Sequence, residues 1–274
     1  MTCAYCARRM QPRESVSHEA QDLVAGYLSP GHGRGPVSAV TAAALQPAPR
    51  APRPSGRPVV VSIAGLAGAG KSSLSRALMR LDPEVRARPS VSVWRYLTGI
   101  PRLIPTFVRL HRPFHGMLGK EMKRILRLHM LERLVHETRD CRILVFDEGP
   151  VYLLARILVY GGPGIRTRSF QECWQRAIAT WATELDAIVW LEAPEDLLAA
   201  RLRARPQHPF AHTGTDDRSV RGLLRAYREA FAQVIGELTA AGGPRPWPVR
   251  TDLASVDWTA RDLLIRLRRL CGPA

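Results

Sequence analysis

The chain contains 274 residues, of which 46% are apolar, and it carries a net charge of +16. This composition is sufficient to bury the core of one large domain, and it excludes a chain that is disordered throughout. The positive charge favours anionic partners such as nucleotides, sugar phosphates, nucleic acid or acidic lipid.

Membrane-spanning and disulfide-rich secreted classes do not fit the sequence. It has no run of about 18 apolar residues, which a membrane-spanning helix needs, and its N-terminus lacks the apolar core of a signal peptide. The five cysteines are odd in number and irregular in spacing, which argues against a disulfide framework. We therefore expect a cytoplasmic protein without a membrane span.

The first 57 residues differ from the rest of the chain. Residues 46–57 are rich in proline and arginine, a composition typical of a linker. Cys3 and Cys6 form a C-x-x-C pair, but no second pair with the spacing of a zinc finger follows. We expect residues 1–57 to be a disordered or weakly structured extension, and residues 58–272 to form the folded domain.

The most informative motif is G-x-x-x-x-G-K-[ST] at residues 65–72, between an apolar run predicted to be a strand (58–64) and a predicted helix (71–81). Glycines in such a loop let backbone N–H groups approach phosphate oxygens, and the helix dipole adds positive potential. Lys71 is expected to reach the β- and γ-phosphates, and the Ser72 hydroxyl to ligate Mg²⁺. The predicted ATP-binding residues are Gly65, Leu66, Ala67, Gly68, Ala69, Gly70, Lys71, Ser72 and Ser73.

Strands and helices alternate along the rest of the chain, which predicts an α/β fold with a parallel sheet and helices on both faces. The further predicted strands are 90–96, 142–148, 187–192 and 247–250. The further predicted helices are about 118–138, 150–160, 169–184, 194–205, 218–241 and 256–270. The sequence thus predicts a three-layer α/β/α domain with a five-stranded parallel sheet and a helical lid or insertion.

Asp147 and Glu148 end the apolar strand predicted at 142–148, as in a Walker B motif. An acid placed there can hold Mg²⁺ or accept a proton from an attacking hydroxyl. Asp147 is the preferred candidate because it ends the apolar run, but the division of these roles between the two acids stays open.

Arg201 and Arg205 lie four residues apart on one face of the helix after the fourth strand. Phosphoryl transfer spreads negative charge over the transferred group, and arginines from a closing lid can neutralise that charge. We expect both arginines to be catalytic residues of a lid.

The order of these motifs resembles that of small P-loop kinases of the thymidylate kinase and deoxynucleoside kinase group, over residues 58–270. The resemblance implies the P-loop kinase fold, ATP and Mg²⁺ as cofactors, and catalytic roles for Lys71, Asp147, Arg201 and Arg205, with Mg²⁺ held by Ser72 and Asp147. The chain departs from the group in two respects. Glu148 stands where those kinases have an arginine after the acid, and the predicted strand 90–96 ends without an acid that could bind a nucleoside hydroxyl.

Two activities fit these observations. The first is a kinase that transfers the γ-phosphate of Mg-ATP to a small acceptor such as a nucleoside or nucleotide. The second is a P-loop ATPase that acts as a switch or motor on a protein or nucleic acid. Candidate acceptor-binding residues are Trp94, Tyr96, Glu148 and Tyr152, although an aromatic residue by itself usually belongs to a core.

Nucleic acid is not favoured as a partner, because no zinc finger, aromatic RNA motif or basic helical repeat accompanies the positive charge. Four basic residues of the predicted helix 118–138 are interpreted as a solvated face. These four are Lys120, Lys123, Arg124 and Arg127. A homodimer is left open.

Overall fold

The structure is a computed structural model, and it describes residues 57–87, 120–161, 165, 168–204 and 217–271. Its strands are β1 (Val59–Gly65), β2 (Val85–Ala87), β3 (Ile143–Phe146), β4 (Ala187–Glu192) and β5 (Pro246–Arg250). Its helices are α2 (Lys71–Leu81), α4 (Lys120–Glu137), α5 (Pro150–Tyr160), α6 (Arg168–Glu184), α7 (Glu195–Arg203), α9 (Asp217–Ala240) and α10 (Val256–Leu270).

The five strands form one parallel sheet in the order β2-β3-β1-β4-β5. β1 lies at the centre, where Val61 is in register with Val145 of β3 and with Ala187 of β4. All seven residues of β1 are buried, as expected for a strand covered on both faces. The apolar run of β1 therefore forms the middle of the core.

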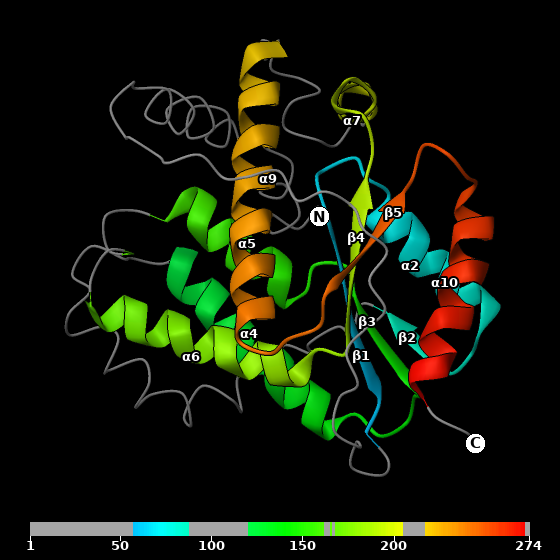
Figure 1. The fold of residues 1–274 in the computed structure, drawn as a ribbon, viewed down its shortest axis with the longest axis horizontal. Helices are drawn as coiled ribbons and strands as arrows, with labels where there is room; N and C mark the ends of the chain where they lie inside the picture. The colour runs from blue at the N-terminus through cyan, green and yellow to red at the C-terminus, as the bar shows by residue number, and fades with distance from the viewer. Residues whose placement is uncertain (1–56, 88–119, 162–164, 166–167, 205–216, 272–274) are drawn as a thin grey trace, which may run out of the picture.

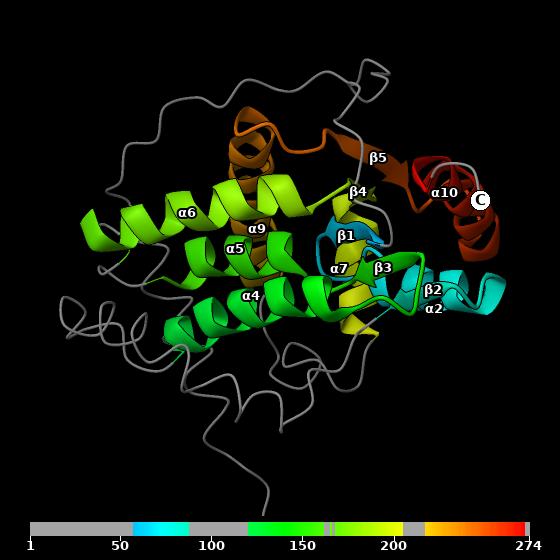
Figure 2. The same cartoon turned by 90° about the horizontal axis from the view of Figure 1, so that it is seen from below.

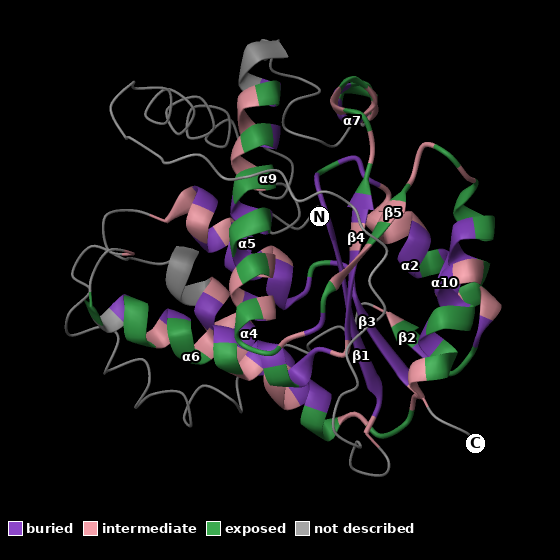
Figure 3. Ribbon diagram, viewed as in Figure 1, coloured by how far each residue is buried: buried purple, intermediate pink, exposed green. Residues whose placement is uncertain are grey.

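Helices cover both faces of this sheet (Figure 1). α4, α5, α6 and α9 form a layer on one side, and α2 and α10 lie together on the other side. The view from below shows the same three layers (Figure 2). Buried residues concentrate on the strands and on the inward faces of the helices (Figure 3). The three-layer α/β/α fold with a five-stranded parallel sheet is confirmed.

Local sequence signals account for where several elements begin. α2 follows Gly70, whose φ of 91° is in the left-handed region that glycine tolerates. α5 has Pro150 in its first turn, where the missing N–H of proline costs nothing. α10 is capped by Ser255, whose hydroxyl accepts a hydrogen bond of 3.2 Å from the backbone N–H of Trp258.

Two predicted boundaries are corrected. The second strand of the sheet is Val85–Ala87, which begins only three residues after α2 is capped by Asp82, whereas the predicted range 90–96 lies outside the described residues. Pro194 is not the first residue of α7 but its N-cap, with an extended backbone, so the helix begins at Glu195. Both shifts displace elements by only a few residues and leave the topology unchanged.

α10 is tied to the end of α2 by an ion pair. Arg268 donates hydrogen bonds of 3.0 and 2.7 Å to Oδ2 of Asp82, which is almost fully buried. Just before β1, the half-buried Arg57 lies 2.8 Å from Glu184 at the end of α6. The domain boundary expected after residue 57 stays a prediction.

Candidate functional site

The ends of the parallel strands bring several segments to one edge of the sheet. β1 leads into the glycine-rich loop, β3 into Asp147, and β4 into α7, while β5 ends beside Thr251. Because the carboxyl ends of parallel strands meet at a common edge, this is where open α/β sheets bind ligands. The site is built here.

The glycine-rich loop is shaped by three glycines with positive φ, namely Gly65, Gly68 and Gly70. A Cβ at Gly65 would lie 2.8 Å from the carbonyl oxygen of Leu191, so the loop packs closely on β4. A Cβ at Gly70, in contrast, would meet nothing within 4 Å. The loop is thus packed at its start and open at the residue that precedes α2, which fits a bound phosphate group.

Lys71 lies at the first position of α2 and folds back over the loop. Its Nζ donates hydrogen bonds of 2.7 Å to the carbonyl oxygen of Gly65 and 3.0 Å to that of Leu66. The ammonium group is therefore held at the mouth of the loop, where it can exchange carbonyl oxygens for phosphate oxygens.

The first turn of α2 and the end of β3 bring together Ser72 and Asp147, which are 75 residues apart in the sequence. The Ser72 hydroxyl donates a hydrogen bond of 3.0 Å to Oδ2 of Asp147. Asp147 is buried, with only 5% of its surface exposed. A hydroxyl and a carboxylate at this separation offer the oxygen ligands that Mg²⁺ prefers.

Glu148 is in a different environment from Asp147. It is exposed, and its carboxylate lies 3.6 Å from the guanidinium of Arg127 on α4. Asp147 thus bonds to Ser72, whereas Glu148 is directed toward Arg127 of α4.

Arg201 of α7 bridges two of the converging segments. Its Nη1 donates to the carbonyl oxygen of Gly68 at 3.3 Å, and its Nη2 donates to the carbonyl oxygen of Thr251 at 3.3 Å. The guanidinium group therefore lies between the glycine-rich loop and the segment after β5. Arg205 lies outside the described residues.

Of the predicted acceptor-binding residues, Tyr152 lies beside the glycine-rich loop. The centroid of its ring is 5.8 Å from Nζ of Lys71. The ring also stacks on Tyr227 of α9, with centroids 6.3 Å apart and planes 3° apart. Trp94 and Tyr96 lie outside the described residues.

Two arginines near Tyr152 were not predicted to belong to the site. Arg156 lies over the rings of Tyr152 and Tyr160, and Arg124 lies over that of Tyr160. The interpretation of Arg124 as part of a solvated face is wrong, because its side chain is half-buried against α5. The spacing of four residues between Tyr152, Arg156 and Tyr160 is the signal that would have found Arg156.

The electrostatics of this region are set by burial and by the neighbouring phenols. Burial raises the pKa of Tyr227 well above its ordinary value, and the phenols of Tyr152 and Tyr160 add to this effect. Burial alone would lower the pKa of Arg156, but the three surrounding phenols raise it, so the guanidinium stays charged.

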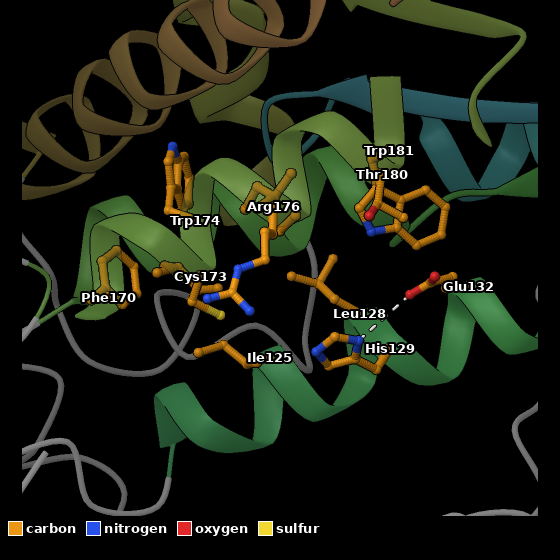
Figure 4. A pocket seen from close by; sticks show the side chains of 13 residues that line it. Ile125, Leu128, His129, Glu132, Phe170, Cys173, Trp174, Arg176, Thr180 and Trp181 are labelled. Carbon is orange, nitrogen blue, oxygen red and sulfur yellow. Dashed lines mark ion pairs between the residues drawn. The ribbon is translucent and has the colours of Figure 1, made fainter. Parts of the chain in front are cut away.

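A separate cavity of about 130 Å³ lies between α4, α5 and α6 (Figure 4). Its walls are largely apolar and include Phe170, Trp174 and Trp181, and Arg176 extends across it from α6 toward α4. Its lining includes neither Asp147 nor any residue of the glycine-rich loop, so this cavity is distinct from the site at the sheet edge.

Other kinds of site find no support in the part of the chain that the structure describes. Within it, no group of three or more His, Cys, Asp or Glu side chains is placed to hold a metal ion, and Cys3 and Cys6 lie outside it. None of the described helices combines the length and the apolar character needed to cross a bilayer.

The central position of β1, the glycine-rich loop between β1 and α2, and the order β2-β3-β1-β4-β5 define a fold of the P-loop kinase type. The predicted resemblance to small P-loop kinases is confirmed at this level. No protein-family model matches the chain, and comparison with curated proteins gives no significant match.

Solved structures similar to this chain include small-molecule kinases. A deoxyadenosine kinase from M. mycoides with bound dATP is 14% identical, with a TM-score of 0.42 over 77% of this chain and 100% of the other. A shikimate kinase from Acinetobacter baumannii in complex with shikimate is 15% identical, with a TM-score of 0.44 over 80% and 97%. A gluconokinase from Sinorhizobium meliloti 1021 is 18% identical, with a TM-score of 0.38 over 78% and 94%.

Proposed function

We propose that this protein is an ATP-dependent phosphotransferase that moves the γ-phosphate of Mg-ATP to a small acceptor. The observation that carries the proposal is the convergence of Lys71, Ser72 and Asp147, with the Ser72 hydroxyl 3.0 Å from Asp147. This arrangement supplies a cation for the phosphates, oxygen ligands for a metal and a carboxylate near the transferred group.

The triphosphate would bind in the glycine-rich loop, residues 65–73. Backbone N–H groups of the loop and the N-terminus of α2 would donate to its oxygens, and Lys71 would release Gly65 and Leu66 to neutralise them. Arg201 already lies against the loop at Gly68, so its charge would reach the nucleotide side of the site.

When bound, Mg²⁺ would supply charge neutralisation between the β- and γ-phosphates. Ser72 and Asp147 fit this ion because both present oxygen atoms and already lie within hydrogen-bond distance of each other. Asp147 would hold the ion, or accept the proton of the acceptor hydroxyl, and its burial protects the reacting group from water. Arg205 would add positive charge from a lid.

A kinase is favoured over a switch or motor ATPase because aromatic and basic side chains suited to a small molecule lie near Lys71. Tyr152 and Arg156 occupy the acceptor side, within 6 Å of one another. In a hydrolytic switch this region would need only to admit water.

The test is release of ADP from Mg-ATP across a panel of nucleosides, nucleoside monophosphates, sugars and hydroxy acids. If the protein is a kinase, the rate of ADP release rises with the concentration of one acceptor, and Lys71→Ala abolishes that rise. Steady hydrolysis that depends on Lys71 but on no acceptor would instead support the switch or motor ATPase.

A further inference from the structure

The acceptor side of the site contains a group of five side chains, which we name the arginine–tyrosine cluster: Arg124, Tyr152, Arg156, Tyr160 and Tyr227. We propose that this cluster binds an anionic group, a phosphate or a carboxylate, carried by the acceptor molecule. The inference rests on the proposed function and names the class of its substrate.

The cluster is assembled from three helices. Tyr152, Arg156 and Tyr160 recur every fourth residue and so share one face of α5. Tyr227 of α9 packs against this face, with its ring centroid 6.0 Å from that of Tyr160. Arg124 of α4 lies over the ring of Tyr160, with its Cζ 5.4 Å from the ring centroid. Helix packing therefore fixes the cluster before any ligand arrives.

Arg156 is held in an orientation that suits an anion. Its Cζ lies 5.9 Å from the centroid of Tyr152 and 5.6 Å from that of Tyr160, so the aromatic rings hold the guanidinium from its sides. Its Nε is buried and has no hydrogen-bond partner among the described residues. A buried donor of this kind is costly unless an acceptor reaches it, and a phosphate or carboxylate oxygen would do so.

Two guanidinium groups, those of Arg156 and Arg124, belong to the cluster. Among the described residues, Glu148 is the carboxylate that acts on the charge of Arg156, and it lies 3.6 Å from Arg127. Arg124 adds a further positive charge beyond Tyr160. Two guanidinium groups in one cluster favour an anionic acceptor.

The position of the cluster gives the acceptor a direction. Lys71 Nζ and Arg156 Cζ lie 5.8 and 5.9 Å from the centroid of the same ring, that of Tyr152. An acceptor with its anionic group on Arg156 would extend past this ring toward Lys71 and Asp147. A neutral acceptor would use the same space but would leave the Nε of Arg156 without a partner.

The experiment compares acceptors that differ only in the anionic group, with the full-length protein and Mg-ATP. The pairs are deoxyadenosine with its 3′-monophosphate, which keeps the 5′-hydroxyl, glucitol with gluconate, and the methyl ester of shikimate with shikimate. The first pair tests a phosphate, and the others test a carboxylate. Each is measured with the wild type, Arg156→Gln, Arg156→Lys and the control Arg133→Gln, which removes an exposed arginine of α4 paired with Glu137.

We expect the anionic member of one pair to be preferred, with Arg156→Gln raising its KM by roughly 30- to 100-fold and Arg156→Lys by less. The neutral member and the affinity for a fluorescent ATP analogue should be unchanged. Equal use of both members by the wild type, or an unchanged preference in Arg156→Gln, would overturn the inference while leaving the kinase intact.

Calorimetric titration of the same acceptors in the presence of Mg-ADP separates this inference from the proposed function. If the wild type turns over no acceptor but binds an anionic one through Arg156, the proposed function fails and the anion site stands. If no anionic acceptor binds better than its neutral partner, the inference fails whatever the kinase assay gives. Loss of ATP-analogue binding in Arg156→Lys, with an unchanged melting temperature, would assign the cluster to the nucleotide instead.

Discussion

The hydroxyl of Ser72 donates a 3.0 Å hydrogen bond to the carboxylate of Asp147. This bond joins the first turn of α2 to the end of β3, which neighbours β1 in the sheet. Since β1 and β3 are paired in a fixed register, with Val61 opposite Val145, the distance between these two side chains is set by the sheet. The oxygen atoms proposed to hold Mg²⁺ are therefore preorganised.

The first prediction concerns this pair. Ser72→Ala removes a proposed metal ligand, and Asp147→Asn removes negative charge while keeping size. We expect both changes to raise the Mg²⁺ concentration that gives half-maximal activity by about tenfold or more. Asp147→Asn should in addition lower kcat by about 100-fold. A titration of activity with Mg²⁺ measures both effects.

Ser75→Ala is the matched control, because Ser75 lies in the same helix and its buried hydroxyl has no partner among the described residues. It should leave the Mg²⁺ response unchanged and stability unchanged or slightly higher. An identical Mg²⁺ response in wild type and Ser72→Ala would remove Ser72 from the proposed metal site.

A second prediction concerns Arg201, which bonds to Gly68 in the loop and to Thr251 after β5. Arg201→Ala should weaken binding of an ATP analogue by about tenfold, since one charged contact beside the loop is lost. Arg203→Ala is the control, because Arg203 is exposed on the same helix. Fluorescence titration compares the two, and equal affinities would show that Arg201 only braces α7.

The third prediction contrasts two glycines. A Cβ at Gly149 would clash with Phe146 and lie 3.2 Å from the Ser62 hydroxyl, so Gly149→Ala should lower the free energy of unfolding by about 1–3 kcal/mol. Gly236 is exposed within α9, and a Cβ there meets nothing within 4 Å. Gly236→Ala should raise the free energy of unfolding by about 0.5–1 kcal/mol. Urea denaturation measures the free energy of unfolding of both variants. A value for Gly149→Ala equal to that of the wild type would show that the connection between β3 and α5 can relax.

The fourth prediction concerns cysteine reactivity. Burial raises the pKa of the Cys141 thiol to about 11, with Asp140 adding to the shift. Since the thiolate is the reactive form, iodoacetamide at pH 8 should modify Cys141 about a hundredfold more slowly in the folded protein than in the unfolded one. Mass spectrometry of the labelled peptide measures the two rates.

The pH dependence has a definite sign. The folded state binds the Cys141 proton more tightly, so the rate of iodoacetamide modification of the folded protein should rise up to about pH 11. For the same reason, this thiol should lower the free energy of unfolding as the pH rises above its pKa in the unfolded chain. A folded-state rate that levels off near pH 9 would mean that the thiol is not shielded.

The nucleotide side of the site could be predicted from sequence because its signals are local. The spacing of glycines before Lys71 and the acid after an apolar strand each lie within a few consecutive residues. The helix bounds at Lys71–Leu81, Pro150–Tyr160 and Val256–Leu270 also agree with those predicted, since glycine, proline and serine mark where these helices begin.

The acceptor side could not be predicted in the same way. Tyr152 and Tyr227 stack across 75 residues of sequence, and no local pattern indicates that pairing. Arg124 looked like one of several solvated arginines, because the helix face that α5 covers is decided by packing. β2 was misplaced because a three-residue edge strand such as Val85–Ala87 is too short for a periodic pattern.

The four-residue spacing on α5 has a consequence for how this chain can change its substrate. Inserting or deleting one residue between Tyr152 and Tyr160 would turn every following side chain by about 100° and carry Arg156 or Tyr160 away from the site. The length of α5 is therefore constrained, while the chemical identity of positions 152, 156 and 160 is free to vary. Divergence toward new acceptors should proceed by substitution on this one face, with the proposed phosphate-binding edge of the sheet left untouched.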